Sequence, residues 1–189
     1  MRIISGKLKG HKIYLPKNKK TRPLKDSVRE SLFNLLHHSK KIYFKFEKSN
    51  ILDLYSGTGS FGLECLSRQS RNVSFVENEM DAIEILRKNI EKFKLKDKTN
   101  IFIYDVIKVL EKEILSDAKF DLIFCDPPFK DCNTKKLIEL IYNNNLLKKK
   151  GIIILHRNKK NKEKIPDFLK LVEERNYGIS KIIFGRFLS

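Results

Sequence analysis

The chain has 189 residues, 41% of them hydrophobic, and a formal net charge of +17 at pH 7. This length suits one domain with a sizeable core, and since no apolar stretch suits a membrane span or a signal region, we expect a cytoplasmic protein without a membrane partner. The charge indicates a polyanionic partner, although an AT-rich genome would also favour lysine. The three cysteines contain no C-x-x-C pair, so we expect neither a disulfide framework nor a metal site.

We expect two parts. Residues 1–40 form a small basic extension, and residues 41–189 form the main domain as a single globular unit. Residues 2–5 and 11–15 are expected to pair as two short strands around the glycine-flanked turn at 6–10. Such an extension adds basic surface beside the main domain.

A helix is expected next, ending near residue 38, because apolar residues recur at helical spacing at Val28, Leu32, Leu35 and Leu36. Ser27 and Glu30 have the spacing of a capping box, and Asp26 is the alternative N-cap. The helix therefore starts near residue 26 in either case.

Five apolar segments follow, separated by helical patterns, near residues 50–54, 73–77, 101–105, 121–125 and 151–156. This alternation predicts a parallel sheet covered by helices on both faces. Residues 168–175 and 179–187 predict a closing antiparallel hairpin, with a helix over 163–175 as the alternative. We therefore predict an α/β fold, with a mostly parallel seven-stranded sheet.

A glycine-rich loop follows the first of these segments. Gly57, Gly59 and Gly62 spell G-x-G-x-x-G at a predicted strand-to-helix turn, which lets a backbone approach a nucleotide-like ligand closely. A dinucleotide site and an S-adenosylmethionine site are both compatible with this pattern. Asp53, just before the glycines, favours the second, because a carboxylate suits a cationic amino group better than a pyrophosphate.

Acids also end the next two predicted strands. Glu77 lies about 20 residues past the glycines, where an acid typically bonds ribose hydroxyls; alternatively it stabilises the N-terminus of the following helix. Asp105 has the position of an adenine-amine acceptor, or of an N-cap for a helix over 106–115. Both roles are open at each position.

The tetrapeptide Asp126-Pro127-Pro128-Phe129, here called the DPPF loop, follows the apolar run 122–125. Neither proline donates a backbone hydrogen bond, and the residue before a proline is pushed toward an extended conformation. The result is a stiff loop with a carboxylate, backbone carbonyls and an aromatic ring, which suits gripping an exocyclic amine of a flat base. An ordinary surface turn is the alternative.

More specific is the opening part of the chain, with R-I-I-S-G at 2–6, G-H-K-I at 10–13, T-R-P at 21–23 and V-R-E-S-L-F-N at 28–34. Together with the two loops, it resembles the bacterial 16S ribosomal RNA guanine-N2 methyltransferases of the RsmD type. The resemblance covers nearly the whole chain. Phe129 is a departure, because tyrosine is common there in related amino-methylating enzymes: the stacking ring is kept and the hydroxyl lost. Residues 130–132 fit only loosely.

The resemblance implies a Rossmann-like class I methyltransferase that transfers a methyl group from S-adenosylmethionine to N2 of a guanine in 16S rRNA. It implies a substrate within an assembled or nearly assembled small ribosomal subunit. We expect a monomer, and the reaction needs no metal. The implied cofactor-binding residues are Asp53, Tyr55, Gly57, Thr58, Gly59, Glu77, Asn78, Asp105 and Val106. The implied catalytic residues are Asp126, Pro127, Pro128 and Phe129.

The predicted RNA contacts are basic residues of the extension and its helix: Arg2, Lys7, Lys9, Arg22 and Arg29. Guanidinium groups can grip phosphate with two hydrogen bonds, although Arg22 or Arg29 can instead order the cofactor loop. Two other functions fit parts of the pattern. One is another amino-group methyltransferase, acting on DNA adenine-N6 or cytosine-N4 or on protein glutamine; the other is a nicotinamide-dependent oxidoreductase, which Asp53 disfavours.

Overall fold

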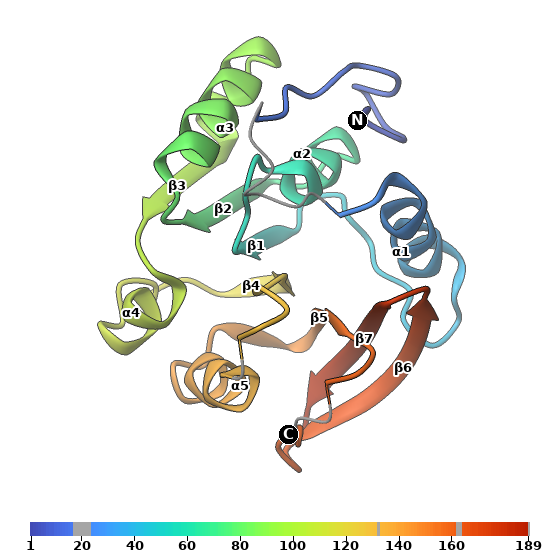
Figure 1. Cartoon of the computed structure of the whole chain (residues 1–189), viewed down its shortest axis with the longest axis vertical. Helices are drawn as coiled ribbons and strands as arrows, with labels where there is room; N and C mark the ends of the chain where they lie inside the picture. Colours follow the sequence, from blue (N-terminus) through green and yellow to red (C-terminus); the bar gives the residue numbers. More distant parts are fainter. Residues whose placement is uncertain (17–23, 132, 162–163, 189) are drawn as a thin grey trace.

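The structure is a computed structural model, and it describes residues 1–16, 24–131, 133–161 and 164–188. Seven strands form one sheet in the order β3-β2-β1-β4-β5-β7-β6 (Figure 1). The strands are β1 (Asn50–Leu54), β2 (Asn72–Glu77), β3 (Thr99–Ile103), β4 (Phe120–Cys125), β5 (Leu147–Asn158), β6 (Leu169–Tyr177) and β7 (Ser180–Phe187).

The first five strands pair in parallel, whereas β7 runs antiparallel to both β5 and β6. The predicted parallel sheet with a closing antiparallel hairpin is therefore confirmed. The alternative of a helix over 163–175 is wrong, because β6 occupies the described part of that range from Leu169 onward.

Helices cover both faces of the sheet. The three on one face are α1 (Asp26–His38), α2 (Ser60–Ser67) and α3 (Met80–Lys92), and the two on the other are α4 (Val106–Glu111) and α5 (Thr134–Asn143); a 3₁₀ turn, η1 (Lys96–Lys98), precedes β3 (Figure 1). No helix in the described part of the chain is long and apolar enough to cross a membrane.

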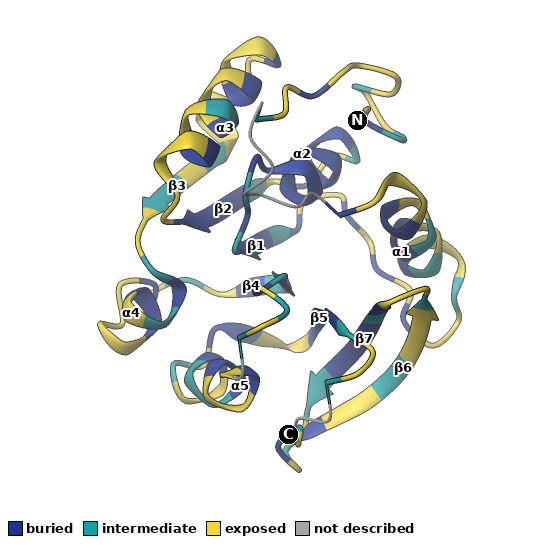
Figure 2. Ribbon diagram, in the orientation of Figure 1, coloured by how far each residue is buried: buried dark blue, intermediate teal, exposed yellow. Residues whose placement is uncertain are grey.

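The core has one apolar layer on each side of the sheet. Along β4, Leu122 and Phe124 pack with α1, α2 and α3, and Ile123 and Cys125 pack with α4 and α5. Alternate residues of a strand point to opposite faces, so a sheet buried on both sides needs continuous apolar strands. β1, β2 and β4 are accordingly buried along most of their length (Figure 2).

Several elements begin or end at other residues than predicted. β3 ends at Ile103, two residues early, and α4 ends at Glu111 instead of near residue 115. β5 begins at Leu147 instead of near residue 151, so the lysine run 148–150 lies in an exposed part of that strand. The apolar run 152–155 marks only the buried part of that strand.

The N-terminal extension pairs only briefly as a hairpin. Arg2 and Lys12 form a single antiparallel bridge instead of two strands. The reason is the buried carboxylate of Glu64 on α2, which accepts the Ile4 N–H (2.7 Å) and the Ser5 N–H (3.0 Å). The backbone that would extend the hairpin is thus bonded to α2.

The predicted caps of α1 are wrong. The residue at the N-cap position is Lys25, and no side chain caps the helix there. Asp26 lies inside the first turn, where its carboxylate pairs with Arg29 at 3.0 Å. Asp26 therefore pairs with the buried guanidinium of Arg29 and does not cap the helix.

Candidate functional site: the carboxyl ends of β1, β2 and β4

Three carboxylates gather at one edge of the sheet. Asp53 is in β1, Glu77 ends β2 and Asp126 follows β4, and these strands are neighbours in the order β2-β1-β4. The chain changes direction across the sheet between β1 and β4, and ligands of open α/β sheets bind at such switch points, outside the carboxyl ends of the strands.

The glycine loop adopts a conformation that its glycines require. Gly59 immediately precedes α2 with φ of 80°, a left-handed value that disfavours other residues. A Cβ at Gly62 would lie 2.4 Å from the Phe75 ring, so the third glycine allows α2 to pack closely on β2. The Asp53 carboxylate accepts the Gly62 N–H at 3.0 Å and thereby ties β1 to the first turn of α2.

Glu77 links the glycine loop to the start of α3. Its carboxylate accepts the N–H groups of Gly57 (2.7 Å), Asn78 (2.8 Å) and Glu79 (3.0 Å). Glu77 thus lies just before α3, which begins at Met80, and it bonds the backbone that leads into the helix and no N–H of the helix itself. Its predicted ribose contact is compatible with this position, because the bonded glycine belongs to the nucleotide-type loop.

The site is electrostatically unfavourable for anions. Burial raises the pKa of Asp53 well above its ordinary value, the Gly62 hydrogen bond opposes the shift, and the charges of Asp126 and Glu77 add to it. Carboxylates this close repel one another, and a cationic ligand would relieve the repulsion. The arrangement therefore favours a ligand with positive charge over a pyrophosphate.

Other predicted cofactor residues lie at the same edge. Tyr55 follows β1 with φ of 59°, and burial raises the pKa of its phenol; a non-glycine residue in this conformation often marks a functional site. Thr58 is buried in the glycine loop. Asp105 accepts the Lys108 N–H at 3.0 Å, so its role as N-cap of α4, which begins at Val106, is confirmed.

The DPPF loop lies directly beside β1. The Asp126 N–H donates to the Leu54 carbonyl at 3.3 Å, and the Asp131 N–H donates to the Pro128 carbonyl at 2.8 Å. Pro127 is buried, Asp126 and Phe129 are half-buried, and Pro128 is exposed. The loop is therefore a fixed turn with part of its carboxylate and aromatic ring accessible.

Two residues at the end of β5 hold the DPPF loop, and the sequence did not single them out. His156 Nδ1 lies 2.6 Å from Asp126 Oδ1. The buried guanidinium of Arg157 donates to the carbonyls of Pro128 (3.3 Å) and Asp131. Their only sequence signal is a histidine and an arginine directly after the apolar run 152–155.

The predicted RNA contact at Arg29 is wrong. Its side chain is completely buried, so it cannot grip RNA phosphate. It donates to the carbonyls of Ser60 (3.4 Å), the first residue of α2, and of Arg2. Burial lowers its pKa from the ordinary value, and Asp26 and Glu64 oppose that shift. Of the two predicted alternatives, ordering of the cofactor loop agrees with this placement.

Asn89 of α3 joins the extension to the glycine loop in a second place. Its buried side-chain amide accepts the Tyr14 N–H (2.8 Å) and donates to the carbonyls of Tyr14 and Thr58, both at 3.2 Å. The extension is therefore bonded to the elements around the candidate site.

Three of the four remaining predicted RNA contacts lie on the described part of the extension. Arg2, Lys7 and Lys9 are exposed on the extension, whereas Arg22 lies outside the described residues. The described residues hold no group of three or more His, Cys, Asp or Glu side chains suited to a metal ion.

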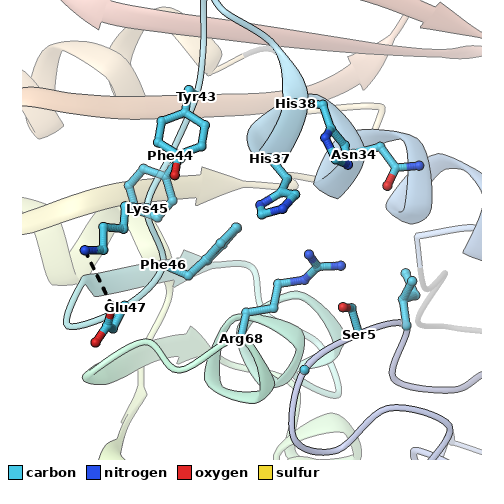
Figure 3. Close-up of a pocket in the computed structure, with 12 residues that line it drawn as sticks. Ser5, Asn34, His37, His38, Tyr43, Phe44, Lys45, Phe46, Glu47 and Arg68 are labelled. Carbon is cyan, nitrogen blue, oxygen red and sulfur yellow. Dashed lines mark ion pairs between the residues drawn. The ribbon is translucent and has the colours of Figure 1, made fainter.

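A separate cavity of about 480 Å³ lies between the last turn of α1, residues 43–47 and Arg68. Figure 3 shows the histidine, aromatic and charged side chains around it, including the Lys45–Glu47 ion pair at 3.5 Å. None of its lining residues belongs to the glycine loop or the DPPF loop, so it is distinct from the site described above.

Comparisons with known proteins identify relatives over most of the chain. The family described as Conserved hypothetical protein 95 matches residues 1–186. Ribosomal RNA small subunit methyltransferase D of Buchnera aphidicola is 34% identical over 83% of this chain and 76% of its own. The protein of that name from Haemophilus influenzae is 31% identical over 95% of this chain and 90% of its own.

Solved structures share the fold. A candidate methyltransferase of Escherichia coli, yhhF, superposes with a TM-score of 0.84 at 25% identity, covering 99% of this chain and 97% of its own. A candidate methyltransferase complexed with SAH has a TM-score of 0.61 at 16% identity, over 85% of this chain and 48% of its own. With the sheet order and the family match, these findings set aside the oxidoreductase interpretation: the chain belongs to the RsmD family of class I methyltransferases.

Proposed function

We propose that this protein transfers a methyl group from S-adenosylmethionine to the exocyclic N2 of a guanine in 16S rRNA of the small ribosomal subunit. The observation that carries the proposal is the position of the DPPF loop, with Asp126 hydrogen-bonded to the end of β1 beside the glycine loop. Relatives named ribosomal RNA small subunit methyltransferase D support an rRNA substrate.

The residues present fit this cofactor. A Cβ built at Gly57 would meet no atom within 4 Å, so the loop is open to a ligand at that point, and Glu77 lies next to it. The cluster of carboxylates suits a cation. In the proposal, Glu77 bonds the ribose hydroxyls and Asp105 accepts a bond from the adenine amine. Asp53 lies on the side of the cationic amino group of the methionine moiety. Tyr55, Thr58, Asn78 and Val106 complete the contacts.

When bound, S-adenosylmethionine supplies an activated methyl group on a sulfonium sulfur. The guanine amine is a poor nucleophile, because its lone pair is delocalised into the ring. In the proposed mechanism Asp126 and the Pro127 carbonyl accept the two amine hydrogens and turn the lone pair toward the methyl group. Such alignment can contribute about 7–11 kcal/mol. Asp126 or water then takes the proton that the amine loses.

Phe129 has the place of a stacking platform. Its ring is half-buried beside Asp126, and a stacked base gains about 1–3 kcal/mol. A base in folded RNA must first leave its stack, which costs a few kcal/mol, so this gain offsets part of that cost.

Replacing Glu77 with alanine is expected to weaken S-adenosylmethionine binding by about 1–3 kcal/mol, because a charged hydrogen-bond acceptor is lost. Isothermal calorimetry with S-adenosylmethionine measures this directly. Glu79→Ala, at the N-cap of the same helix, is the control and should bind nearly normally. An unchanged dissociation constant for Glu77→Ala would remove this residue from the site.

Replacing lysines of the extension with glutamine is expected to lower the affinity for RNA and to make that affinity less dependent on salt. For Lys7→Gln and Lys9→Gln, the slope of log affinity against log salt should flatten by about one unit per lost phosphate contact. Lys170→Gln on β6, also an exposed lysine, should leave the slope unchanged. Equal slopes for all three variants would place the RNA elsewhere.

The proposed substrate is tested with unmethylated small ribosomal subunits and protein-free 16S rRNA, each incubated with the enzyme and labelled cofactor. We expect N2-methylguanosine in the nucleoside digest, and faster transfer to subunits, because so compact a protein can read little sequence by itself and must recognise a folded surface. A different methylated nucleoside would contradict the guanine-N2 assignment. Equal or faster transfer to naked RNA would contradict recognition of the assembled particle.

A further inference from the structure

The end of β5 and the segment after it bond the DPPF loop at three points. His156 bonds the Asp126 carboxylate, Arg157 bonds the Pro128 carbonyl, and the Asn161 amide donates to the Phe129 carbonyl at 3.3 Å. The bond from His156 reaches the carboxylate that the proposed reaction uses.

His156 is well fixed. Its side chain is 8% exposed, while that of Asp126 is 20% exposed. The preceding residue, Leu155, pairs in register with Cys125, which precedes Asp126, so neighbouring buried strands set the distance between the two side chains. The Phe129 ring packs against the imidazole edge-on, with centroids 5.2 Å apart.

The surroundings of the imidazole indicate its tautomer. Nε2 is buried and has no hydrogen-bond partner among the residues that the structure describes, while Nδ1 faces a carboxylate oxygen at 2.6 Å. A buried N–H without a partner is costly, and a lone pair on Nδ1 would oppose the carboxylate. The proton therefore belongs on Nδ1.

We propose that His156 is a positioning residue of the methyl-transfer site, donating its Nδ1–H to one oxygen of Asp126 so that the other oxygen is held toward the target amine. The inference rests on the proposed role of Asp126 and adds a residue outside the DPPF loop. It predicts that the identity and position of the hydrogen-bond donor matter, and not merely the filling of space by a side chain.

Three variants separate these effects. Asparagine places its amide N–H near the position of Nδ1, glutamine places it near that of Nε2, and leucine fills space without a donor. With saturating cofactor and RNA, His156→Leu should lower the single-turnover rate about 10- to 100-fold, because the carboxylate is no longer held. His156→Asn should restore most of the rate, and His156→Gln less. The dissociation constant of S-adenosylhomocysteine should stay near normal in all three.

The control is His37→Leu, on the exposed last turn of α1, which should not change the rate. Thermal melting identifies any variant that fails to fold; if the leucine variant fails, the comparison between asparagine and glutamine still decides. Equal rates in His156→Asn, His156→Gln and His156→Leu would overturn the proposal, whether those rates are reduced or the same as that of the natural protein.

A second measurement does not depend on activity. Nitrogen-15 NMR of the histidine side chains should show the His156 proton on Nδ1, with a resonance that shifts in Asp126→Ala. An Nδ1 without a proton would overturn the proposal even if methyl transfer proceeds. The mass of the methylated nucleoside tests the RNA target separately: a product other than N2-methylguanosine would contradict the proposed function while the three rates still decide the role of His156.

Discussion

Replacing Asp126 with alanine is expected to reduce methyl transfer by about 10²- to 10⁴-fold, the range lost with a positioned proton acceptor. The cofactor should bind nearly as before, because the glycine loop and Glu77 are bonded to each other and not to Asp126. Single-turnover rates at saturating RNA, together with calorimetry of S-adenosylhomocysteine, separate the two effects.

Asp126→Asn is the matched variant, since it keeps the shape and one acceptor oxygen and removes the negative charge. It should retain more of the alignment and still transfer slowly. A rate in Asp126→Ala equal to that of the natural protein would contradict the mechanism, and a large loss of cofactor affinity would move Asp126 from the target amine to the cofactor.

Replacing Glu64 with alanine is expected to destabilise the protein by about 3–5 kcal/mol, the usual result of removing one partner of a buried ionic group. The side chain of Glu64 is fully buried and pairs with Arg68 at 2.9 Å. It also accepts the N–H groups of Ile4 and Ser5. Without the carboxylate, these two donors and the guanidinium of Arg68 lose their partner.

Urea unfolding measures the loss, and limited proteolysis should show earlier cleavage within residues 1–14. Glu64→Gln should lose less, because it keeps one acceptor oxygen. Glu47→Ala removes a carboxylate from the exposed pair with Lys45, and such surface pairs contribute little, so its midpoint should be nearly normal. A similar midpoint for Glu64→Ala would show that the extension is held by its apolar contacts alone.

The strands and the carboxylates at their ends were predictable because both depend on local sequence. An apolar run buried on two faces differs plainly from its polar ends, and an acid at such an end lies at the ligand-binding edge of a parallel sheet. Asp53, Glu77 and Asp126 were found in this way. Their partners were harder to find, because a hydrogen bond between β4 and β5 depends on strand register.

The burial of Arg29 had a signal in the sequence, but the charge of the side chain led to the opposite prediction. It lies four residues before Phe33 and seven before Leu36, on the apolar face of α1. Helical spacing thus placed it toward the core, whereas its charge favoured a surface role. The structure resolves the conflict with buried partners for the guanidinium, namely two backbone carbonyls and Asp26.

The bonds of Arg29 and Asn89 have a thermodynamic consequence. Each side chain joins the extension to the glycine loop or to the helix that follows it, through Arg2 and Ser60 in one case and Tyr14 and Thr58 in the other. A ligand that displaces the extension therefore changes the free energy of the loop. By linkage, if a ligand bound at the extension changes the affinity of the loop for its own ligand, the loop's ligand changes the affinity at the extension by the same factor. In the proposed function these two ligands are the RNA and the cofactor.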